Sequence, residues 1–591
     1  MLDEPKSPMR HSCLVVLFYL VASLALTWPL ARNFGSHLPA VAIPYDALLH
    51  VFLLGWGWHG LTTNPLEVFN APIFYPEFRT LTYMDHMLGE AVLAGPIIEV
   101  FGLGAAYNSL VIFSFVASGY FVYRLALLYG ISRSGSFVAG FLFAFCPYRF
   151  SHLGCLNQIQ TQFIPLGIFF AVSFIRTRRT RYGVGAALTL AVQSYFGWYS
   201  TFHLLVALVV LVGWEVMREP GRWRRLPWRK AAPLALMSAV LVVPSALPYI
   251  LQRLAMPEFD RPFSETIRCS ADLLDYLRVN SDNILAPLNP PLGHWWWGFF
   301  PGLMATGLAA VAIAAVCRAQ AKPSPSEPRS GRATLLERAR GAIRRWGEMG
   351  YLPVLGVSGL VLSLGPILQV AGHRLWIPLP YALCYYVIPG FSSMRTPGRF
   401  AVLVALATAV LAGLGFDTLR CRYPRLGSAF LVGVLLAAGA LAWCPTLPFV
   451  PYPDRASMPP VYGWLAAQPD SSPVLELPVP VKAWEDLIHV RRQMYVLYHG
   501  KPRLDGASGF TSNRYKAFRL DMQAFPAQEA IRCAYDMGAR RLIVHYGDYV
   551  PALREGMRRQ VESAKDLREI AAFGQDVVYE IEEPGTLLES S

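Results

Sequence analysis

Residues 12–31 read SCLVVLFYLVASLALTWPLA and contain no charged side chain. A helix of about 20 apolar residues crosses the roughly 30 Å of hydrocarbon in a bilayer, so this stretch predicts a membrane-spanning helix. Lys6 and Arg10 stand just before it, as in a secretory signal peptide. However, the apolar stretch is longer than a signal-peptide core, and no small-residue cleavage site is evident. We therefore predict a retained first span whose N-terminus is cytoplasmic.

The composition extends this prediction to most of the chain. Of the 591 residues, 54% are hydrophobic and only 15% are charged, and the mean hydropathy is +0.36. Ordinary soluble proteins have about 25% charged residues. Because a chain this poor in charge cannot cover a water-facing surface, we exclude a set of soluble globular domains, a disordered protein and a coiled coil.

Further uncharged stretches predict further spans. Residues 182–214 are too many for one crossing, and the polar turn at 193–200 divides them into two spans. Segment 86–104 carries two glutamates and a proline, so we predict a surface or re-entrant helix there. The other predicted spans are 105–123, 134–148, 153–175, 231–251, 298–317, 351–371, 400–416 and 427–447. The sequence thus predicts a polytopic α-helical membrane protein with about 11 spans.

The basic residues support this topology. With the N-terminus inside, the predicted cytoplasmic segments hold 25 Lys and Arg residues, whereas the longer outer loops hold 10. Counting 86–104 as a span would place the basic clusters at 176–179 and 222–230 outside, against the positive-inside rule. The formal net charge of +13 therefore follows from topology, and we do not expect a nucleic-acid partner.

The sequence changes character after about residue 450. Helices are predicted at 461–468 and 528–537, and strands at 473–478, 541–546 and 577–581. We predict a transmembrane domain, 1–450, with a long first outer loop at 32–105, followed by an α/β domain, 451–591. An odd number of spans precedes the second domain, which places it outside the cytoplasm.

Common soluble-enzyme motifs are missing from the sequence. It contains no phosphate-cradling glycine-rich loop, no HExxH and no GxSxG, so we expect neither ATP binding nor peptide hydrolysis. The nine cysteines show no paired spacing and no zinc-binding CxxC, so we expect no structural disulfide.

Unusual polar residues gather on the predicted outer side. Asp46 begins an amphipathic run with helical spacing, so it is either a helix cap or a functional carboxylate. His50 follows one turn later on the same face and can pair with it. Other outer residues are Tyr75, Asp85, Glu90, His152, Asn157, Tyr195 and the aromatic run at 294–297, which is also typical of an interfacial belt.

Two arginines stand where the topology does not require them. Arg395 and Arg399 lie at a predicted helix start on the outer side. Guanidinium groups there need an anionic partner, and a lipid-linked phosphate is the natural one. Ordinary anchoring to lipid headgroups is the alternative.

Several short motifs resemble one large family. They are Asp46 after the first span, residues 74–76, the Pro-Tyr-Arg…His…Asn stretch at 147–157, residues 362–366, 389–400 and 474–478. Together they resemble the GT-C glycosyltransferase superfamily of multi-pass proteins, including the YfhO-like bacterial membrane proteins. The resemblance covers nearly the whole chain, and it implies a bacterial cytoplasmic (inner) membrane location.

The resemblance also implies a reaction. Such enzymes transfer a sugar from a polyprenyl-phosphate donor to an envelope lipid, glycan or protein acceptor outside the cytoplasm. An acidic residue of the first outer loop acts as the base, and Asp46 matches that position. Family members often have two adjacent acidic residues there, whereas Asp46 lies between Tyr45 and Ala47. A possible divalent metal ion therefore stays open, as does a second carboxylate from Asp85 or Glu90.

These observations give one hypothesis and two alternatives. Asp46 is the predicted catalytic base, and Arg395 and Arg399 are predicted to bind the donor phosphate. The residues predicted to bind sugar or acceptor are His50, Tyr75, Asp85, His152, Asn157 and Tyr195. The alternatives are a transporter or flippase of lipid-linked sugar, which predicts inverted repeats that we do not find, and a non-catalytic envelope-assembly protein.

Overall fold

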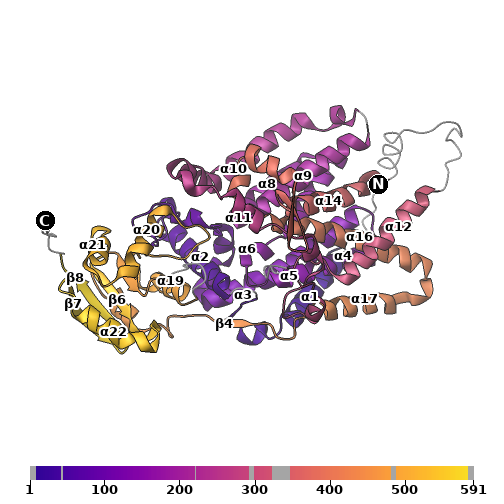
Figure 1. The fold of residues 1–591 in the computed structure, drawn as a ribbon. Helices are drawn as coiled ribbons and strands as arrows, with labels where there is room; N and C mark the ends of the chain where they lie inside the picture. The colour runs from indigo at the N-terminus through magenta and orange to yellow at the C-terminus, as the bar shows by residue number, and fades with distance from the viewer. Residues whose placement is uncertain are drawn as a thin grey trace. The chain divides into compact units, whose positions relative to one another are not determined.

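The computed structural model describes residues 8–41, 44–219, 221–291, 298–321, 346–480 and 487–583 (Figure 1). The aromatic run at 294–297 lies outside these residues. The chain divides into two compact units. The helical unit comprises Met1–Asn33, Asn108–Ala246 and Asp260–Phe449, and the mixed unit comprises Phe34–Tyr107, Leu247–Phe259 and Val450–Ser591.

The helical unit consists mainly of α-helices, and each predicted span overlaps at least one of them. An apolar segment in hydrocarbon must satisfy its backbone groups internally, which a helix does. The helices are α1 (Pro8–Leu26), the second part of α3 (Leu88–Leu128), α4 (Arg133–Ala144), α5 (Pro147–Ser151), α6 (Leu156–Ile159), α7 (Phe163–Thr177), α8 (Thr180–Phe196), α9 (Trp198–Arg218), most of α10 (Trp228–Ala255), α11 (Phe263–Arg268), α12 (Leu303–Ala321), α14 (Tyr351–Ser363), α15 (Pro380–Val387), α16 (Ala401–Arg422) and α17 (Gly427–Ala442).

Several of these helices can cross a membrane. Within the described residues, five stretches are long and apolar enough by length and composition: Leu88–Leu128, Leu156–Thr177, Trp198–Arg218, Trp228–Ala255 and Pro397–Arg422. Three shorter apolar helices accompany them: Arg10–Leu26, Leu303–Arg318 and Gly427–Ala442. The chain therefore has the helices of a membrane protein, and the number of about 11 spans stays a prediction.

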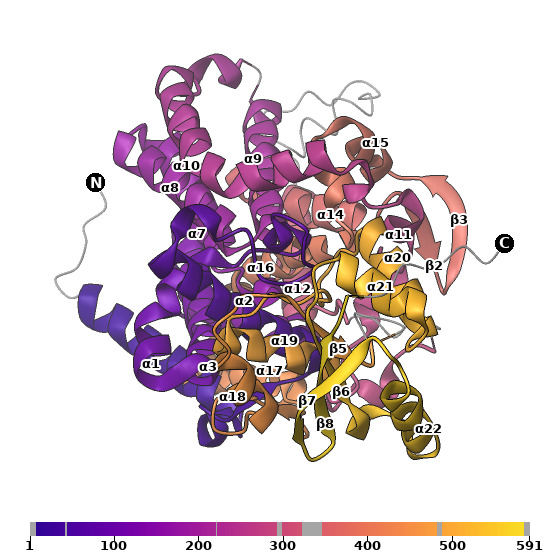
Figure 2. The ribbon, with the colours of Figure 1, turned by 90° about the vertical axis from the view of Figure 1, so that its left-hand side faces the viewer.

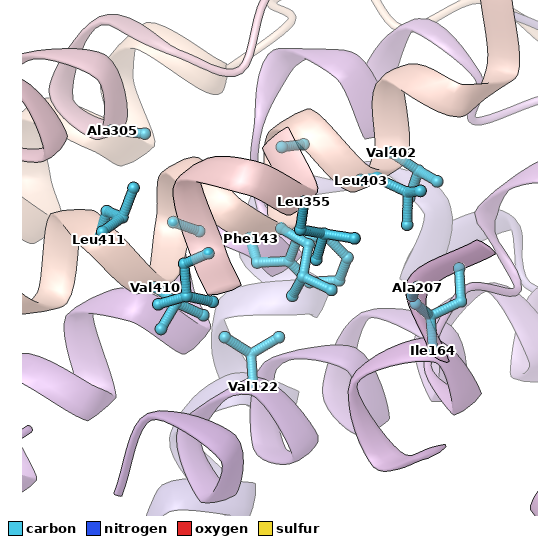
Figure 3. Close-up of a cluster of buried hydrophobic side chains, with 14 of the residues drawn as sticks. Val122, Phe143, Ile164, Ala207, Ala305, Leu355, Val402, Leu403, Val410 and Leu411 are labelled. Carbon is cyan, nitrogen blue, oxygen red and sulfur yellow. The ribbon is translucent and has the colours of Figure 1, made fainter. Parts of the chain in front are cut away.

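The apolar helices differ in how deeply they are buried. Only 11% of the most apolar stretch of α10 is buried, against 78% in the helix that contains α16. An apolar surface this exposed suits lipid. The α16 residues Val402, Leu403, Val410 and Leu411 instead lie in the core with Leu355 of α14 (Figure 3). α16 is therefore the central helix of this core.

Glycines let α16 approach its neighbours closely. A Cβ atom added at Gly415 would lie 1.8 Å from the carbonyl oxygen of Leu308 in α12. A Cβ atom added at Gly413 would lie 2.6 Å from the carbonyl oxygen of Gly135 in α4. Small residues at helix contacts permit close backbone packing where no hydrophobic effect drives association. These two positions thus set the spacing of α4, α12 and α16.

The predicted span at 351–371 is wrong in its second half. α14 ends at Ser363, and Gly365 takes a φ of 70° just before Pro366, which stops the helix. An antiparallel hairpin follows, with β2 (Ile367–Val370) and β3 (His373–Pro378). Apolar composition alone did not reveal this change of structure.

Two other span boundaries also need correction. The helix within 134–148 ends at Ala144, ahead of Pro147, because a residue before proline avoids the helical conformation. The helix within 153–175 begins only at Phe163, and the polar segment before it forms the short α6. The predicted division of 182–214 is confirmed, since Gly197, with a φ of 149°, separates α8 from α9.

Segment 86–104 is helical over most of its length. It forms the first part of α3, a 41-residue element that is interrupted at Gly102, where φ is 82° and ψ is 172°. A straight helix of that length would measure about 60 Å, twice the thickness of the hydrocarbon. The break at Gly102 therefore makes two helices of α3, and the second contains the predicted span at 105–123.

The mixed unit contains a four-stranded sheet, with the order β5-β6-β8-β7. β5 is parallel to β6, and β8 pairs antiparallel with both β6 and β7. The elements are β1 (His37–Pro39), α2 (Pro44–Thr63), the first part of α3, β4 (Phe449–Pro451), α18 (Pro460–Ala466), β5 (Val474–Leu477), α19 (Leu487–His499), α20 (Asn513–Asp521), α21 (Gln528–Asp536), β6 (Arg541–His545), α22 (Pro551–Glu562), β7 (Leu567–Phe573) and β8 (Asp576–Ile581). Figure 2 shows the sheet with its helices around it.

Each helix and strand predicted after residue 450 is confirmed, and α19, α20, α22 and β7 are additional. The predicted division at residue 450 does not follow the compact units, because 34–107 lies with 450–591. The N–H of Arg503 donates to the carbonyl of Pro72 (3.1 Å), and its own carbonyl accepts from the N–H of Tyr75 (2.9 Å). The first outer segment is thus hydrogen-bonded to the C-terminal residues.

Candidate functional site

The segment 389–400 joins α15 to α16 and is fixed at its start by side chains. Asp260 Oδ1 accepts hydrogen bonds from the hydroxyls of Ser392 (3.0 Å) and Ser393 (3.2 Å). The backbone N–H of Arg261 donates to the carbonyl of Ser392 (3.0 Å). These contacts hold in place the turn that leads to the two predicted phosphate-binding arginines.

Tyr199, in the first turn of α9, contacts both arginines of this segment. Its hydroxyl oxygen accepts hydrogen bonds from the backbone N–H groups of Arg395 (3.0 Å) and Thr396 (3.3 Å). The guanidinium carbon of Arg399 lies 4.0 Å from the centre of the Tyr199 ring. Such a cation–π contact contributes about 0.5–2 kcal/mol, depending on desolvation. One tyrosine thus fixes the backbone at Arg395 and the side chain of Arg399.

Arg399 is a cation without a carboxylate partner among the described residues. Its Nε is buried and has no hydrogen-bond partner there. The positive charge of Arg399 interacts electrostatically with Tyr148, His152 and His203. None of these three side chains is an anion that would compensate the charge. Arg399 also precedes α16, whose N-terminal end adds positive potential. A poorly compensated guanidinium at a helix start is suited to bind an anion.

His203 adds a second incompletely bonded group. It follows Tyr199 by four residues on α9, so both lie on the same helix face. Its side chain is buried, and within the described part of the chain neither ring nitrogen has a hydrogen-bond partner. The ring packs edge-on against Phe400, with centroids 4.7 Å apart. The sequence prediction placed Tyr199 in the polar turn at 193–200 but assigned no site role to Tyr199 or His203, because their partners lie about 200 positions later.

Arg149 is a second buried guanidinium of the helical unit. It donates to the hydroxyls of Ser114 (2.7 Å), Ser118 (3.0 Å) and Thr161 (2.6 Å), and its guanidinium carbon lies 4.9 Å from the ring centre of Phe115. These contacts join α3 to α5 and to the segment before α7. Like that of Arg399, its Nε has no hydrogen-bond partner among the described residues. Both terminal nitrogens of Arg149, however, donate to hydroxyls of the protein, so we assign Arg149 a structural role.

The other predicted residues of the helical unit occupy different surroundings. His152 is buried, and its Nδ1 lies 2.7 Å from the carbonyl oxygen of Tyr148. Asn157 is half-buried on α6. Tyr195 donates its hydroxyl hydrogen to the carbonyl of Leu241 in α10 (3.0 Å), so this hydroxyl serves helix packing. Of these three, His152 lies within electrostatic reach of Arg399.

Asp46 and His50 lie at the start of α2 in the mixed unit. Asp46 is in the first turn and is half-buried, and His50, one turn later, is 6% exposed. The predicted helical spacing is therefore present. Asp46 as a residue is partly exposed, as a base that receives an acceptor hydroxyl must be.

Asp85 and Glu90 belong to another part of this unit. Glu90 is fully buried, and its electrostatic neighbour is Asp85. A Cβ atom at Gly57 of α2 would lie 3.1 Å from the Cβ of Ala91, so Glu90 lies level with Gly57. Eleven residues of helix separate Gly57 from Asp46, which is about 16 Å along the axis. The structure thus does not bring Glu90 beside Asp46.

Tyr75 lies where the outer segment meets the C-terminal residues. Its N–H donates to the carbonyl of Arg503, and a Cβ atom at Gly538 would lie 3.3 Å from its ring. Its neighbour Phe74 packs edge-on against Tyr515, with centroids 4.9 Å apart. These contacts make Tyr75 part of the packing within the mixed unit.

A buried ionic cluster of the mixed unit was not predicted. Glu476 of β5 lies 2.9 Å from Nε of Arg503 and 3.1 Å from Nε2 of His545. Asp505 lies 2.8 Å from Arg503, and Asp576 lies 2.8 Å from Nδ1 of His545. Arg503, Glu476 and Asp505 are fully buried. Single residues on separate elements leave no local sequence pattern for such a cluster.

The cluster shifts the pKa values of its members. Burial alone would raise the pKa of Glu476, but Arg503 and His545 hold it well below its usual range. Burial and Arg492 act to lower the pKa of His545, but Asp576 and Glu476 outweigh them and raise it. The cluster therefore favours an ionised Glu476 and a protonated His545.

Metal binding does not fit the described residues. No group of three or more His, Cys, Asp or Glu among them is placed to hold a metal ion. The possible divalent metal ion of the sequence prediction thus has no matching set of three such ligands in this part of the chain.

Comparison with known proteins places this fold. No family model and no curated protein matches the sequence. Among solved structures, the arabinofuranosyltransferase AftD from mycobacteria is 14% identical, covers 98% of this chain and 42% of its own, and has a TM-score of 0.57. An oligosaccharyltransferase from Archaeoglobus fulgidus, solved with an inhibitory peptide and a dolichol-phosphate, is 13% identical, with coverages of 93% and 71% and a TM-score of 0.45. ArnT from Cupriavidus metallidurans is 14% identical, with coverages of 97% and 98% and a TM-score of 0.41.

These proteins are GT-C glycosyltransferases. The likeness to AftD extends over almost the whole of this chain, and the chain therefore shares the fold of AftD. It spans less than half the length of AftD. At 14% identity the likeness establishes the fold, and activity must be argued from the residues.

Proposed function

We propose that this protein is a membrane glycosyltransferase that moves a sugar from a polyprenyl-phosphate donor to an envelope lipid, glycan or protein acceptor. The observation that carries the proposal is Arg399, a guanidinium at the start of α16 with a buried, unpartnered Nε and no carboxylate partner among the described residues. The fold shared with AftD supports it. We further propose that the reaction takes place on the outer face of a bacterial inner membrane, with the C-terminal α/β region on that side.

In the proposed reaction, Asp46 accepts the proton of the acceptor hydroxyl as its oxygen attacks the anomeric carbon of the sugar. The bond between that carbon and the donor phosphate oxygen breaks, and the polyprenyl phosphate leaves with the electron pair. Arg395 and Arg399 bind this phosphate and stabilise its growing charge. Because phosphate is a good leaving group, no strong general acid is required. His152 contributes to the polar surroundings of the sugar.

The test is transfer by the purified full-length protein in reconstituted membranes, with radiolabelled polyprenyl-phosphate sugar as donor. Asp46→Asn keeps the size of the side chain and removes the base, so we expect the rate to fall about 10²–10⁴-fold at an unchanged melting temperature. Asp536→Asn, on an exposed position of α21, is the matched control. Full activity of Asp46→Asn would show that Asp46 is not the catalytic base.

The same assay separates the alternatives. A transferase converts the acceptor into labelled product, a flippase moves the labelled donor across the bilayer without changing it, and an assembly protein does neither. Labelled acceptor in the wild-type reaction, absent from protein-free membranes, is the result expected here.

A further inference from the structure

The hydroxyl group of Tyr199 has one unused hydrogen. A phenol oxygen accepts hydrogen bonds through its lone pairs and donates one hydrogen. Here the accepted bonds come from the N–H groups of Arg395 (3.0 Å) and Thr396 (3.3 Å). Across the described ranges of the chain, no acceptor receives the Tyr199 hydrogen. The oxygen is thus fixed in position, and its O–H remains available as a donor.

The neighbours of this hydroxyl define what accepts the hydrogen. Arg399 lies over the Tyr199 ring, and its buried Nε also lacks a partner in the described structure. His203, one turn further along α9, is buried with both ring nitrogens unpartnered in the same described set. The Tyr199 hydroxyl, the Arg399 Nε and the His203 ring can each still donate a hydrogen bond. A ligand that satisfies all three needs several acceptor oxygens, and a negative charge suits the cation of Arg399.

Tyr199 is well suited to meet such an acceptor. Tyr199 is half-buried, so it is not sealed in the core. The two N–H groups that donate to its oxygen polarise the O–H bond, which strengthens it as a donor. The adjacent guanidinium attracts the same anion.

We propose that Tyr199 binds the donor phosphate directly: its O–H, oriented by the backbone of Arg395 and Thr396, donates to a phosphate oxygen that Arg399 also binds. This inference rests on the proposed function, because it assigns a further ligand-binding residue to the phosphate subsite. Tyr199 also positions the subsite, since its ring carries the Arg399 side chain.

The test is binding of decaprenyl phosphate to the full-length protein in detergent, compared with binding of decaprenol, which lacks the phosphate. Tyr199→Phe keeps the ring beneath Arg399 and removes the donor. We expect its affinity for decaprenyl phosphate to fall about ten- to a hundredfold, as for loss of a hydrogen bond to a charged group. Its affinity for decaprenol and its melting temperature without ligand should match those of the control.

The matched control is Tyr351→Phe, which removes another buried tyrosine hydroxyl that contacts α9, through the carbonyl of Ala207 (3.0 Å). Equal affinity of Tyr199→Phe and wild type for decaprenyl phosphate would overturn the inference and leave the proposed function intact. A parallel loss of decaprenol binding would also overturn it, because the role would then be structural. Failure of the wild type to prefer the phosphate over the alcohol would overturn the donor assignment and this inference together.

Discussion

The guanidinium of Arg399 rests on the ring of Tyr199, 4.0 Å from its centre, and the hydroxyl of the same tyrosine accepts the backbone N–H of Arg395. A residue of α9 thus holds two residues that precede α16. The cation is presented without a carboxylate partner in the described residues, so its charge is available to a ligand. The contact of Tyr199 with both arginines thus positions the groups that we propose to bind the donor phosphate.

Arg399→Gln should weaken binding of decaprenyl phosphate by at least about tenfold, because a hydrogen bond to a charged group contributes roughly 1.5–3 kcal/mol. Titration of the purified protein in detergent measures it. Arg420→Gln is the control, since Arg420 is exposed near the end of α16 and donates to the hydroxyl of Ser134 (3.0 Å). Equal affinities of the two variants would contradict a phosphate role for Arg399.

Gly415→Ala should destabilise the helical unit. The added Cβ would lie 1.8 Å from the carbonyl oxygen of Leu308, so α12 and α16 must separate. Overpacking of this kind costs about 1–3 kcal/mol, and the melting temperature in detergent should fall. The control is Gly433→Ala in α17, where the added Cβ meets nothing within 4 Å and alanine favours the helix by about 1 kcal/mol. A melting temperature of Gly415→Ala at or above that of Gly433→Ala would refute the packing argument.

Much of the fold could be predicted because each apolar run carries its own signal. The helices at 12–31 and 400–416 needed only the absence of charge over a sufficient length. The end of α14 could not be placed this way, because residues 364–371, which include β2, are as uncharged as the helix before them. The hydropathy of a segment indicates whether its surroundings are apolar. It does not distinguish a helix such as α14 from a strand such as β2 when both are apolar.

The site was predicted only where a residue was unusual by itself. Arg395 and Arg399 were found because two arginines are unexpected on the outer side of a membrane. Tyr199 is one of 28 tyrosines, and its importance comes from contacts with a distant segment. Glu90 was considered as a partner of Asp46 on chemical grounds, but the packing of Gly57 on Ala91 separates them. Long-range contacts of this kind are not encoded in local patterns.

Arg503→Met should strongly destabilise the mixed unit. Arg503 is fully buried between Glu476 and Asp505, and its removal takes the guanidinium from both buried carboxylates. Glu476 then keeps the contact with His545 but loses the one with Arg503. Breaking a buried ion pair on one side costs about 3–5 kcal/mol. Arg568→Met, which breaks an exposed pair with Glu580, should cost at most about 1 kcal/mol. Thermal unfolding of both variants in detergent provides the comparison. A similar loss of stability in the two variants would show that the buried ion pairs stabilise the protein no more than the exposed pair does.

His545 should make stability depend on pH in a defined direction. Its pKa is raised in the folded protein because Asp576 and Glu476 outweigh burial and the neighbouring Arg492. The resulting stabilisation is complete below the unfolded pKa of about 6.5 and disappears as the pH rises through the folded value. The advantage of wild type over His545→Gln should therefore shrink as the pH rises above about 6.5.

The difference between wild type and variant is the quantity to measure, because other histidines act in the opposite sense. Burial lowers the pKa of His489 and lowers that of His499 to about 4. Both therefore favour the folded state as the pH rises, and they do so equally in wild type and variant. Glu476, whose pKa is lowered, loses its contribution only below about pH 4.5, outside this window. His373→Gln, at an exposed position of β3, is the control for the substitution itself. An advantage of wild type over His545→Gln that is constant or grows with pH would show that His545 is not held protonated by Glu476 and Asp576.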